Sequence, residues 1–387
     1  MSYPPPDPAQ PQPAYPQGPP PQAYQPVPRP VPLPVEESAY HHFLRTPAFA
    51  FWQPIVAILV GAALWLGASL IGSIPMITEI AAGRMKPEDL TAGKILMTPW
   101  VLLGTNLSLA AMIPIAMFGQ WAFFRQRPRW IHSVVGRFRW GWLGISLALL
   151  IPLWFGVLTV QGLLGGEGLT EDTTGGPSAR WQLYLAIILI TTPLQCAGEE
   201  YGFRGLVNRG VAGFFRSDKA GLVAGTLVSS ALFAFAHGST DLWANSFYFG
   251  LGVVLALLAW RTGGLEASIA LHTVNNLISF LAAVYYGQID EPMQMSGVTG
   301  DWTMIIAPLL GLVVVAILEL VRRTLKLQRT GAPGRELIAA QPSMQPVTPP
   351  PAAYGPGPSP HPPQPGVPPP PHHPGPPGPL GGPPPGP

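Results

Sequence analysis

Long apolar segments between Phe49 and Val321 constrain this chain more than any other feature. Most approach the roughly 20 residues that a helix needs to cross the core of a bilayer. The eight segments lie near residues 51–74, 96–118, 140–164, 182–203, 221–237, 242–260, 264–286 and 302–321. Charged residues make up only 10% of the chain, against about a quarter in soluble proteins. The sequence therefore predicts an all-α, polytopic membrane helix bundle with about eight transmembrane helices.

The two ends of the chain differ from its middle, because proline, glycine, alanine and glutamine dominate them. Proline has no amide donor and a fixed φ angle, so such segments form neither helices nor central strands. We expect residues 1–45 and 326–387 to be disordered Pro-rich tails and residues 46–325 to form the helical bundle. The tails are interpreted as solvated spacers, with docking of a proline-binding partner as the alternative.

The charges of the predicted loops alternate along the chain. The second-to-third loop, the fourth-to-fifth loop and the C-terminal flank are basic, whereas the third-to-fourth and seventh-to-eighth loops are acidic. The basic residues include Arg125, Arg137, Arg139, Arg209, Arg216, Lys219, Arg322, Arg323 and Lys326. Since basic loops face the cytoplasm, the sequence predicts a plasma-membrane protein with both termini cytoplasmic. It shows no basic patch on a soluble domain, so nucleic acid is not a predicted partner.

Ionisable side chains inside apolar segments are costly in lipid and are the first candidates for function. One group closes the fourth segment, where residues 198–204 read GEEYGFR. Glu200 and Arg204 are four residues apart, so they share a helix face and can pair. Glu199 is then left to face a cavity, where a carboxylate can act as a general base. The alternative is a simple ion pair at a helix end.

Two further polar groups lie on other segments. His237 closes the fifth segment in the sequence FAFAH, and the seventh contains HTVNN at 272–276. His272 and Asn276 share a helix face, whereas Asn275 points elsewhere. Each group alone also fits hydrogen bonding between membrane helices. Taken together, polar groups on three segments predict one site assembled in the core of the bundle.

These residues allow two kinds of chemistry. A glutamate with two histidines can activate water, and an asparagine with one histidine can donate hydrogen bonds to a developing oxyanion. Alternatively, Glu199, His237 and His272 can bind a divalent metal such as zinc that keeps an open position for water. The residues alone leave both open.

Four other polar or ionisable residues are assigned no catalytic role. Cys196 is interpreted as a small, weakly polar helix residue, and Glu266 as an interfacial acid at the start of the seventh segment. His41 and His42 fall in the polar N-terminal region and are given no function.

The motifs EExxxR, FxxxH and HxxxN occur in this order on successive apolar segments, as EEYGFR at 199–204, FAFAH at 233–237 and HTVNN at 272–276. This pattern resembles the CPBP intramembrane protease family, which includes type II CAAX prenyl endopeptidases and Abi-like bacterial relatives. The resemblance covers roughly residues 45–325. It implies that Glu199 and His237 activate the attacking water.

The resemblance also implies that His272 and Asn276 stabilise the oxyanion, and that the Glu200–Arg204 pair positions the site. Members of the family have been described both as metalloproteases and as metal-independent glutamate proteases, so the resemblance leaves the metal open. The expected partners are membrane lipid and a peptide or protein substrate, with a lipidated or apolar end.

We therefore predict an intramembrane endopeptidase. The alternatives are an ion-coupled transporter that uses the carboxylates and histidines as a relay, and a non-catalytic scaffold or immunity protein. One difficulty concerns the segment boundaries, because they place Glu199 at the inner end of the fourth segment and His237 at the outer end of the fifth. A single site requires a shorter, re-entrant or displaced segment.

Overall fold

The computed structural model describes residues 30–91, 94–164, 176–294 and 300–340. The predicted disorder of residues 1–29 and 341–387 lies outside these described residues. Helices dominate the described part, which confirms the all-α class. The short elements are β1 (Ser38–Ala39), η1 (Tyr40–His42), α3 (Pro87–Thr91), β2 (Lys94–Leu96), η2 (Pro128–Ile131), η4 (Gln288–Asp290), β3 (Pro292–Gln294), β4 (Thr330–Gly331) and α13 (Gly334–Ala339).

Within the described residues, eight helical segments are long and apolar enough to cross a membrane, as predicted, and the chain is an integral membrane protein. Several of these segments combine consecutive helices. In chain order they are α1–α2 (Trp52–Gly72 and Ile74–Ala81), α4–α5 (Pro99–Ala110 and Met112–Phe124), α6 (Trp140–Leu163), α7–η3–α8 (Trp181–Glu199, Glu200–Asn208 and Arg209–Gly213), α9 (Asp218–Ala236), α10 (Leu242–Thr262), α11 (Glu266–Tyr285) and η5–α12 (Trp302–Ile305 and Ile306–Thr324).

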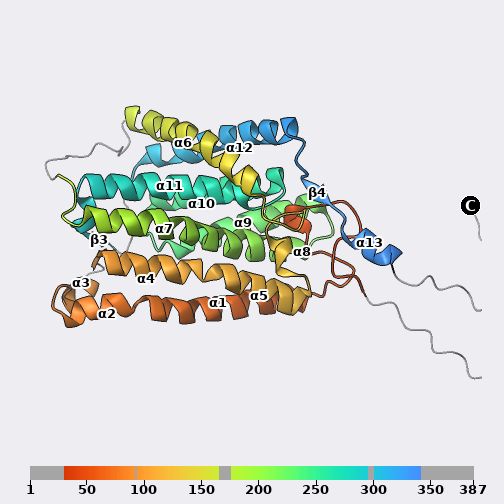
Figure 1. Ribbon diagram of the computed structural model, residues 1–387, viewed down its shortest axis with the longest axis horizontal. Coiled ribbons are helices and arrows are strands. Elements are labelled where there is room, and N and C mark those ends of the chain that lie inside the picture. Colours follow the sequence, from red (N-terminus) through yellow and green to blue (C-terminus); the bar gives the residue numbers. More distant parts are fainter. Residues whose placement is uncertain (1–29, 92–93, 165–175, 295–299, 341–387) are drawn as a thin grey trace, which may run out of the picture. The chain divides into compact units, whose positions relative to one another are not determined.

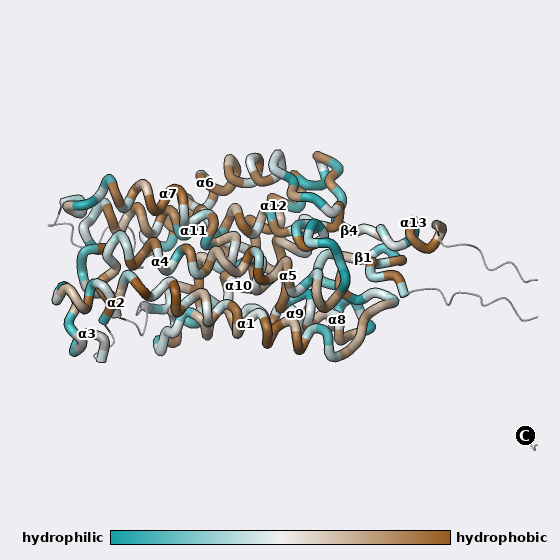
Figure 2. The backbone as a smooth tube through the Cα atoms, turned by 60° about the horizontal axis from the view of Figure 1, so that its bottom comes forward, coloured by the Kyte–Doolittle hydropathy of each residue, from teal (hydrophilic) through white to brown (hydrophobic). Residues whose placement is uncertain are grey.

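The long helices lie side by side in the part of the chain up to residue 340. Figure 1 shows α7 and α11 next to each other, with α4 and α1 on one side and α6 and α12 on the other. Figure 2 shows apolar residues along the helices and hydrophilic residues gathered toward their ends and in the connecting loops. Each helix thus forms the hydrogen bonds of its own backbone and presents an apolar surface to lipid, as a membrane-spanning segment requires.

The helix that carries Glu199 does not end near residue 203, as the sequence predicted. It continues through the π-helix η3 and through α8 to Gly213. The predicted boundary was wrong because Arg209, interpreted as a loop residue, is helical and fully buried. Glu199 therefore lies near the middle of the long helix and not at its end.

Helix α9 packs against η3 and α8. Its 19 residues extend about 28 Å at 1.5 Å per residue, so α9 covers only the second half of the long helix. In agreement, Ile190 and Leu194 of α7 are exposed, whereas Gln195 and Glu199 are buried. Helix α9 thus ends part-way along α7–η3–α8, which removes the separation between Glu199 and His237 that the predicted boundaries implied.

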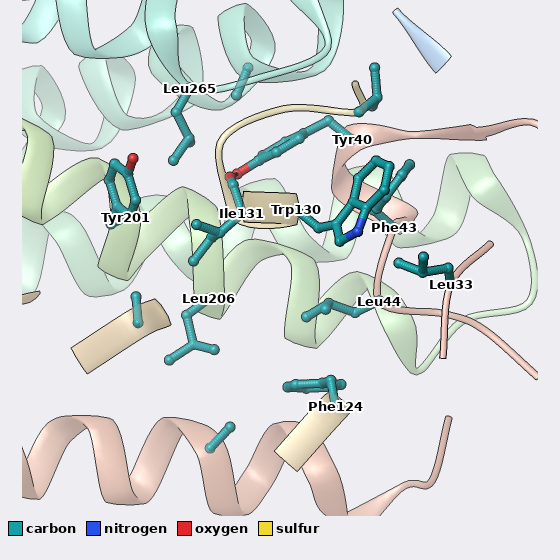
Figure 3. Packing of buried hydrophobic residues seen from close by; sticks show 14 of the residues in the cluster. Leu33, Tyr40, Phe43, Leu44, Phe124, Trp130, Ile131, Tyr201, Leu206 and Leu265 are labelled. Carbon is teal, nitrogen blue, oxygen red and sulfur yellow. Dashed lines mark hydrogen bonds between the residues drawn. The ribbon is translucent and has the colours of Figure 1, made fainter. Parts of the chain in front are cut away.

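Residues 31–45, which we call the N-terminal strap, are folded against the bundle although they were predicted to be part of a disordered tail. Strand β1 of the strap pairs with β4. Tyr40, Phe43 and Leu44 are buried, and the Tyr40 hydroxyl donates a hydrogen bond to the Ile131 carbonyl oxygen at 2.6 Å. Figure 3 shows the Tyr40 hydroxyl beside Ile131 and Phe43 next to Trp130, and Leu44 belongs to the same cluster. The folded part therefore begins before the predicted boundary at residue 45, and β4 and α13 extend it beyond the one at residue 326.

Glu266 is not an interfacial acid, as the sequence predicted, because its side chain is fully buried. Its Oε2 atom lies 2.6 Å from Nη2 of Arg139. This ion pair connects the residue that precedes α6 to the start of α11. Arg139, which was interpreted as one of the basic loop residues, therefore has a structural partner inside the protein.

Candidate active site

Two adjacent carboxylates lie where α7 continues into η3, and both are buried. The Oε1 atom of Glu200 accepts two hydrogen bonds, from Nη1 of Arg204 at 2.9 Å and from Nδ1 of His272 at 3.0 Å. The predicted Glu200–Arg204 pair is confirmed, and it also binds a histidine from α11. Because π-helical turns are often found at functional sites, the widened helix here is consistent with a site built around these residues.

Arg204 connects three helices. Its Nη2 atom donates to the Gly252 carbonyl oxygen of α10 at 3.1 Å, and its guanidinium lies 4.5 Å from the centre of the Phe233 ring of α9. The side chain is almost fully buried. Glu200 is therefore held in place by a cation that is itself held from several sides.

His272 lies between the two carboxylates. A carboxylate only accepts hydrogen bonds, so Nδ1 of His272 donates to Glu200 and Nε2 is turned toward Glu199, 3.5 Å from its Oε2 atom. Oε1 of Glu199 accepts a hydrogen bond from Nε2 of Gln195 at 2.7 Å, whereas its buried Oε2 has no hydrogen-bond partner. Since an unpaired buried oxygen is costly, Oε2 is the atom of this carboxylate that is available to a reactant.

His237 adjoins this group across the Phe233 ring. The centre of that ring lies 4.6 Å from the centre of the His237 ring and 5.6 Å from that of His272. Nδ1 of His237 donates to the Phe233 carbonyl oxygen at 2.8 Å, and the imidazole stacks on Tyr248 at 3.9 Å. In the neutral ring this leaves Nε2 as an acceptor.

Asn276 lies one helical turn after His272 on α11. Its Nδ2 atom donates to Oε1 of Gln195 at 3.2 Å. The structure thus brings the six predicted site residues together. The six are Glu199, Glu200, Arg204, His237, His272 and Asn276. Hydrogen bonds join Glu200 to Arg204 and His272, and a second group joins Glu199 to Asn276 through Gln195. The two groups meet where Nε2 of His272 lies 3.5 Å from Oε2 of Glu199, and His237 lies beside them.

Gln195, which binds both Glu199 and Asn276, was not among the predicted site residues. It is a buried amide, one helical turn before Glu199 in an apolar helix. That spacing was the one signal in the sequence, because residues four apart are neighbours on the same face of a helix.

The predicted metal ligands do not form a complete metal site. Among the residues that the structure describes, no three His, Cys, Asp or Glu side chains are arranged to hold a metal ion. Glu199 and His272 face each other and offer two ligands, fewer than the three protein ligands of catalytic zinc. This arrangement therefore does not fit a catalytic zinc ion.

Residues 181–278 match the family model described as type II CAAX prenyl endopeptidase Rce1-like. The match runs from the start of α7 into α11 and includes every predicted site residue. These residues form an Rce1-like domain. No curated protein and no solved structure matches the chain. The predicted resemblance to the CAAX proteases is thereby confirmed over residues 181–278.

All side chains of the candidate active site belong to the Rce1-like domain, and helices outside this domain pack around them. Trp154 of α6, for example, donates a hydrogen bond to Asn275 of the domain at 3.0 Å. A cavity of about 870 Å³ lies elsewhere, between the start of α6 and the end of α12, and Trp140 and Lys326 line it. No residue of the candidate active site lines this cavity.

Proposed function

We propose that this protein is an intramembrane endopeptidase that hydrolyses a peptide bond in a membrane-associated peptide or protein with a lipidated or apolar end. One observation supports this function best. The carboxylate of Glu199 is held through Oε1 by Gln195, while the unpaired Oε2 faces His272. This is the arrangement that a general base needs.

In the proposed reaction, water binds between Oε2 of Glu199 and Nε2 of His237. Glu199 takes one proton of the water, and the remaining hydroxide forms a bond to the carbonyl carbon of the scissile peptide. When the bond from this carbon to nitrogen breaks, the proton passes from Glu199 to the leaving amine. Glu199 is thereby returned to its starting form.

The developing oxyanion accepts hydrogen bonds from the amide of Asn276 and from Nε2–H of His272. Donation from Nε2 requires His272 to carry a proton on each ring nitrogen, since Nδ1 already donates to Glu200.

The distribution of basic residues supports an orientation in the membrane. Arg125, Arg216 and Arg322 lie near the end of the bundle where Figure 1 labels α5, α8 and β4. Under the positive-inside rule, we propose that this end faces the cytoplasm. Docking of a proline-binding partner concerns residues 1–29 and 341–387 and stays a prediction of the sequence.

The first prediction concerns Glu199. We expect Glu199→Gln to lower kcat by at least about 100-fold, because a positioned general base contributes about 10²–10⁴-fold. Cleavage of quenched-fluorescent peptides, with and without a prenyl group, by detergent-purified protein measures this. The matched control is Glu319→Gln, since Glu319 is another buried glutamate of a spanning helix but pairs with Arg322 and Arg323. The control should keep wild-type cleavage.

Cleavage that survives in both Glu199→Gln and His272→Ala would contradict the proposed site. A chelator arm tests the predicted metal, because loss of cleavage that zinc restores would add a metal to the site. Proton-coupled flux without any cleavage, abolished by Glu199→Gln, would favour the transporter instead.

A further inference from the structure

Four side-chain hydrogen bonds join Trp154 of α6 to the carboxylate of Glu199. Nε1 of Trp154 donates to Oδ1 of Asn275 at 3.0 Å, and Nδ2 of Asn275 donates to Oδ1 of Asn276 at 3.1 Å. Nδ2 of Asn276 then donates to Oε1 of Gln195 at 3.2 Å. The last bond runs from Nε2 of Gln195 to Oε1 of Glu199 at 2.7 Å. In each of the four bonds, the donor is therefore the partner closer to Trp154 and the acceptor is the partner closer to Glu199.

The direction of this hydrogen-bond chain is fixed at both ends. An indole N–H only donates and an ionised carboxylate only accepts, whereas each amide can turn either way. If any one of the three amides were reversed, two oxygens or two NH₂ groups would face each other. One orientation of Asn275, Asn276 and Gln195 therefore satisfies all four bonds.

Burial makes this orientation hard to lose. Trp154 is fully buried, and Asn275 and Gln195 are also buried. A buried polar group that loses its partner is strongly penalised, and bonds in a connected network reinforce one another. The Trp154 indole consequently determines the orientation of amides that lie on other helices.

The orientation has two consequences for the reacting groups. The carbonyl oxygen of Asn276 is turned to Asn275, so its NH₂ group lies toward α7, where one hydrogen binds Gln195 and the other is available to an oxyanion. The Gln195 amide occupies Oε1 of Glu199, which leaves Oε2 to take the proton.

We propose that Trp154, Asn275 and Gln195 are positioning residues, which present the N–H of Asn276 to the reacting carbonyl and hold the Glu199 carboxylate. This inference rests on the proposed peptidase function. It assigns a role to Trp154 of α6, a helix that lies outside the Rce1-like domain.

The test compares two tryptophans of the same helix. Trp154→Phe removes the first donor of the hydrogen-bond chain, and Trp142→Phe is the control because the buried Trp142 indole N–H has no partner. We expect Trp154→Phe and Gln195→Met to lower kcat by about 10–100-fold with KM unchanged, the range set by one hydrogen bond to a charged or reacting group. Trp142→Phe should leave kcat nearly unchanged, although it leaves a similar cavity in the core and should lower the unfolding temperature about as much as Trp154→Phe does.

A pH profile separates positioning from packing. In Gln195→Glu the introduced carboxyl has nearly the shape of the amide but donates to Glu199 only while protonated. Activity of this variant should therefore fall as pH rises and the introduced carboxyl ionises, whereas wild type, which has an amide there, should not show this decrease. A side chain with a purely structural role would not change the profile in this way.

An infrared measurement tests the inference without cleavage. The carboxyl bands of Glu199, assigned by their loss in Glu199→Gln, should shift in Trp154→Phe and in Gln195→Met but not in Trp142→Phe. Loss of cleavage in Glu199→Gln decides the peptidase function separately. Unshifted bands in Trp154→Phe, or equal kcat for the two tryptophan variants, would overturn the hydrogen-bond chain.

Discussion

At the scale of single residues, the site depends on an ion pair whose two side chains are fully buried, Arg204 and Glu200. Removing two charges from water is costly, and their attraction offsets this only when further hydrogen bonds hold them. His272 and the Gly252 carbonyl supply these bonds. Each charge therefore depends on the other for its place in the protein.

The Arg204 prediction is one of stability. We expect Arg204→Met to lower the free energy of unfolding by about 3–5 kcal/mol, because it leaves the Glu200 carboxylate buried without its cation. The double variant with Glu200→Gln should recover much of this loss. Denaturant unfolding in detergent micelles measures all three proteins.

The control is Arg323→Met, which also removes an arginine paired with a glutamate. The Arg323 side chain is 63% exposed, so its loss should cost less than about 1 kcal/mol. A double variant as unstable as Arg204→Met alone would contradict the account of an uncompensated charge.

At the scale of elements, α7 approaches α4 closely at Gly198. A Cβ atom at this position would lie only 2.1 Å from the Leu109 carbonyl oxygen. Small residues allow such contacts between membrane helices. Since Glu199 follows directly, the spacing of α4 and α7 also determines where the carboxylate lies.

We expect Gly198→Ala to push α7 away from α4, to lower the unfolding temperature and to lower kcat by at least about 10-fold, since misplacement by about 1 Å can cost 10²-fold. Gly156→Ala is the control, because an added Cβ in α6 meets no atom within 4 Å. This variant should be neutral or slightly stabilising. Equal behaviour of the two variants would show that the contact does not set the site.

The sequence predicted elements better than their ends. Hydropathy identifies apolar runs long enough to span a membrane, so eight spans were predicted. It cannot distinguish a charged residue in a loop from one buried in the core, so it misplaced the end of the fourth span. Arg209 shows the difference, since its guanidinium lies 4.9 Å from the Tyr40 ring and donates to Gln120 at 2.6 Å. These partners come from distant parts of the chain, so no local pattern predicts them.

The candidate site divides in the same way. Pairs four residues apart, such as Glu200 and Arg204, were predictable because helix geometry alone brings them together. The bond from Trp154 to Asn275 joins residues 121 positions apart. Asn275 was expected to point away from His272 and Asn276, but its Nδ2 atom donates to Oδ1 of Asn276 at 3.1 Å. What else it binds depends on how α6 packs.

At the scale of the whole described unit, the N-terminal strap holds the end of the bundle where α8 leads into α9. His41 of the strap is buried, and its Nε2 atom bonds the Asp218 carbonyl oxygen at 3.1 Å. The Trp260 ring lies against it, while Nδ1 has no partner. Burial lowers the pKa of His41 below its ordinary value near 6.5, although Asp218 acts in the opposite direction.

Because the folded pKa of His41 lies below the unfolded one, the unfolded state binds more protons, and stability falls as pH drops below about 6.5. We expect the unfolding temperature to decrease from about pH 7.5 to about pH 5. His41→Gln should remove part of this decrease, whereas His42→Gln, whose parent side chain bonds the Phe215 carbonyl, should keep it. An unchanged pH dependence in His41→Gln would exclude the strap as its source.

The length of α9 has a consequence for the lipid around the protein. Its 19 residues offer about 28 Å of helix, against about 36 Å for the 24 residues of α6. A longer helix can tilt to fit the bilayer, whereas beside a shorter one the bilayer itself thins, at a fraction of a kcal/mol per ångström of mismatch. The membrane should therefore be thinner beside α9, and headgroups there come closer to the level of His237. Acyl-chain length then becomes a determinant of how readily a substrate backbone descends to Glu199.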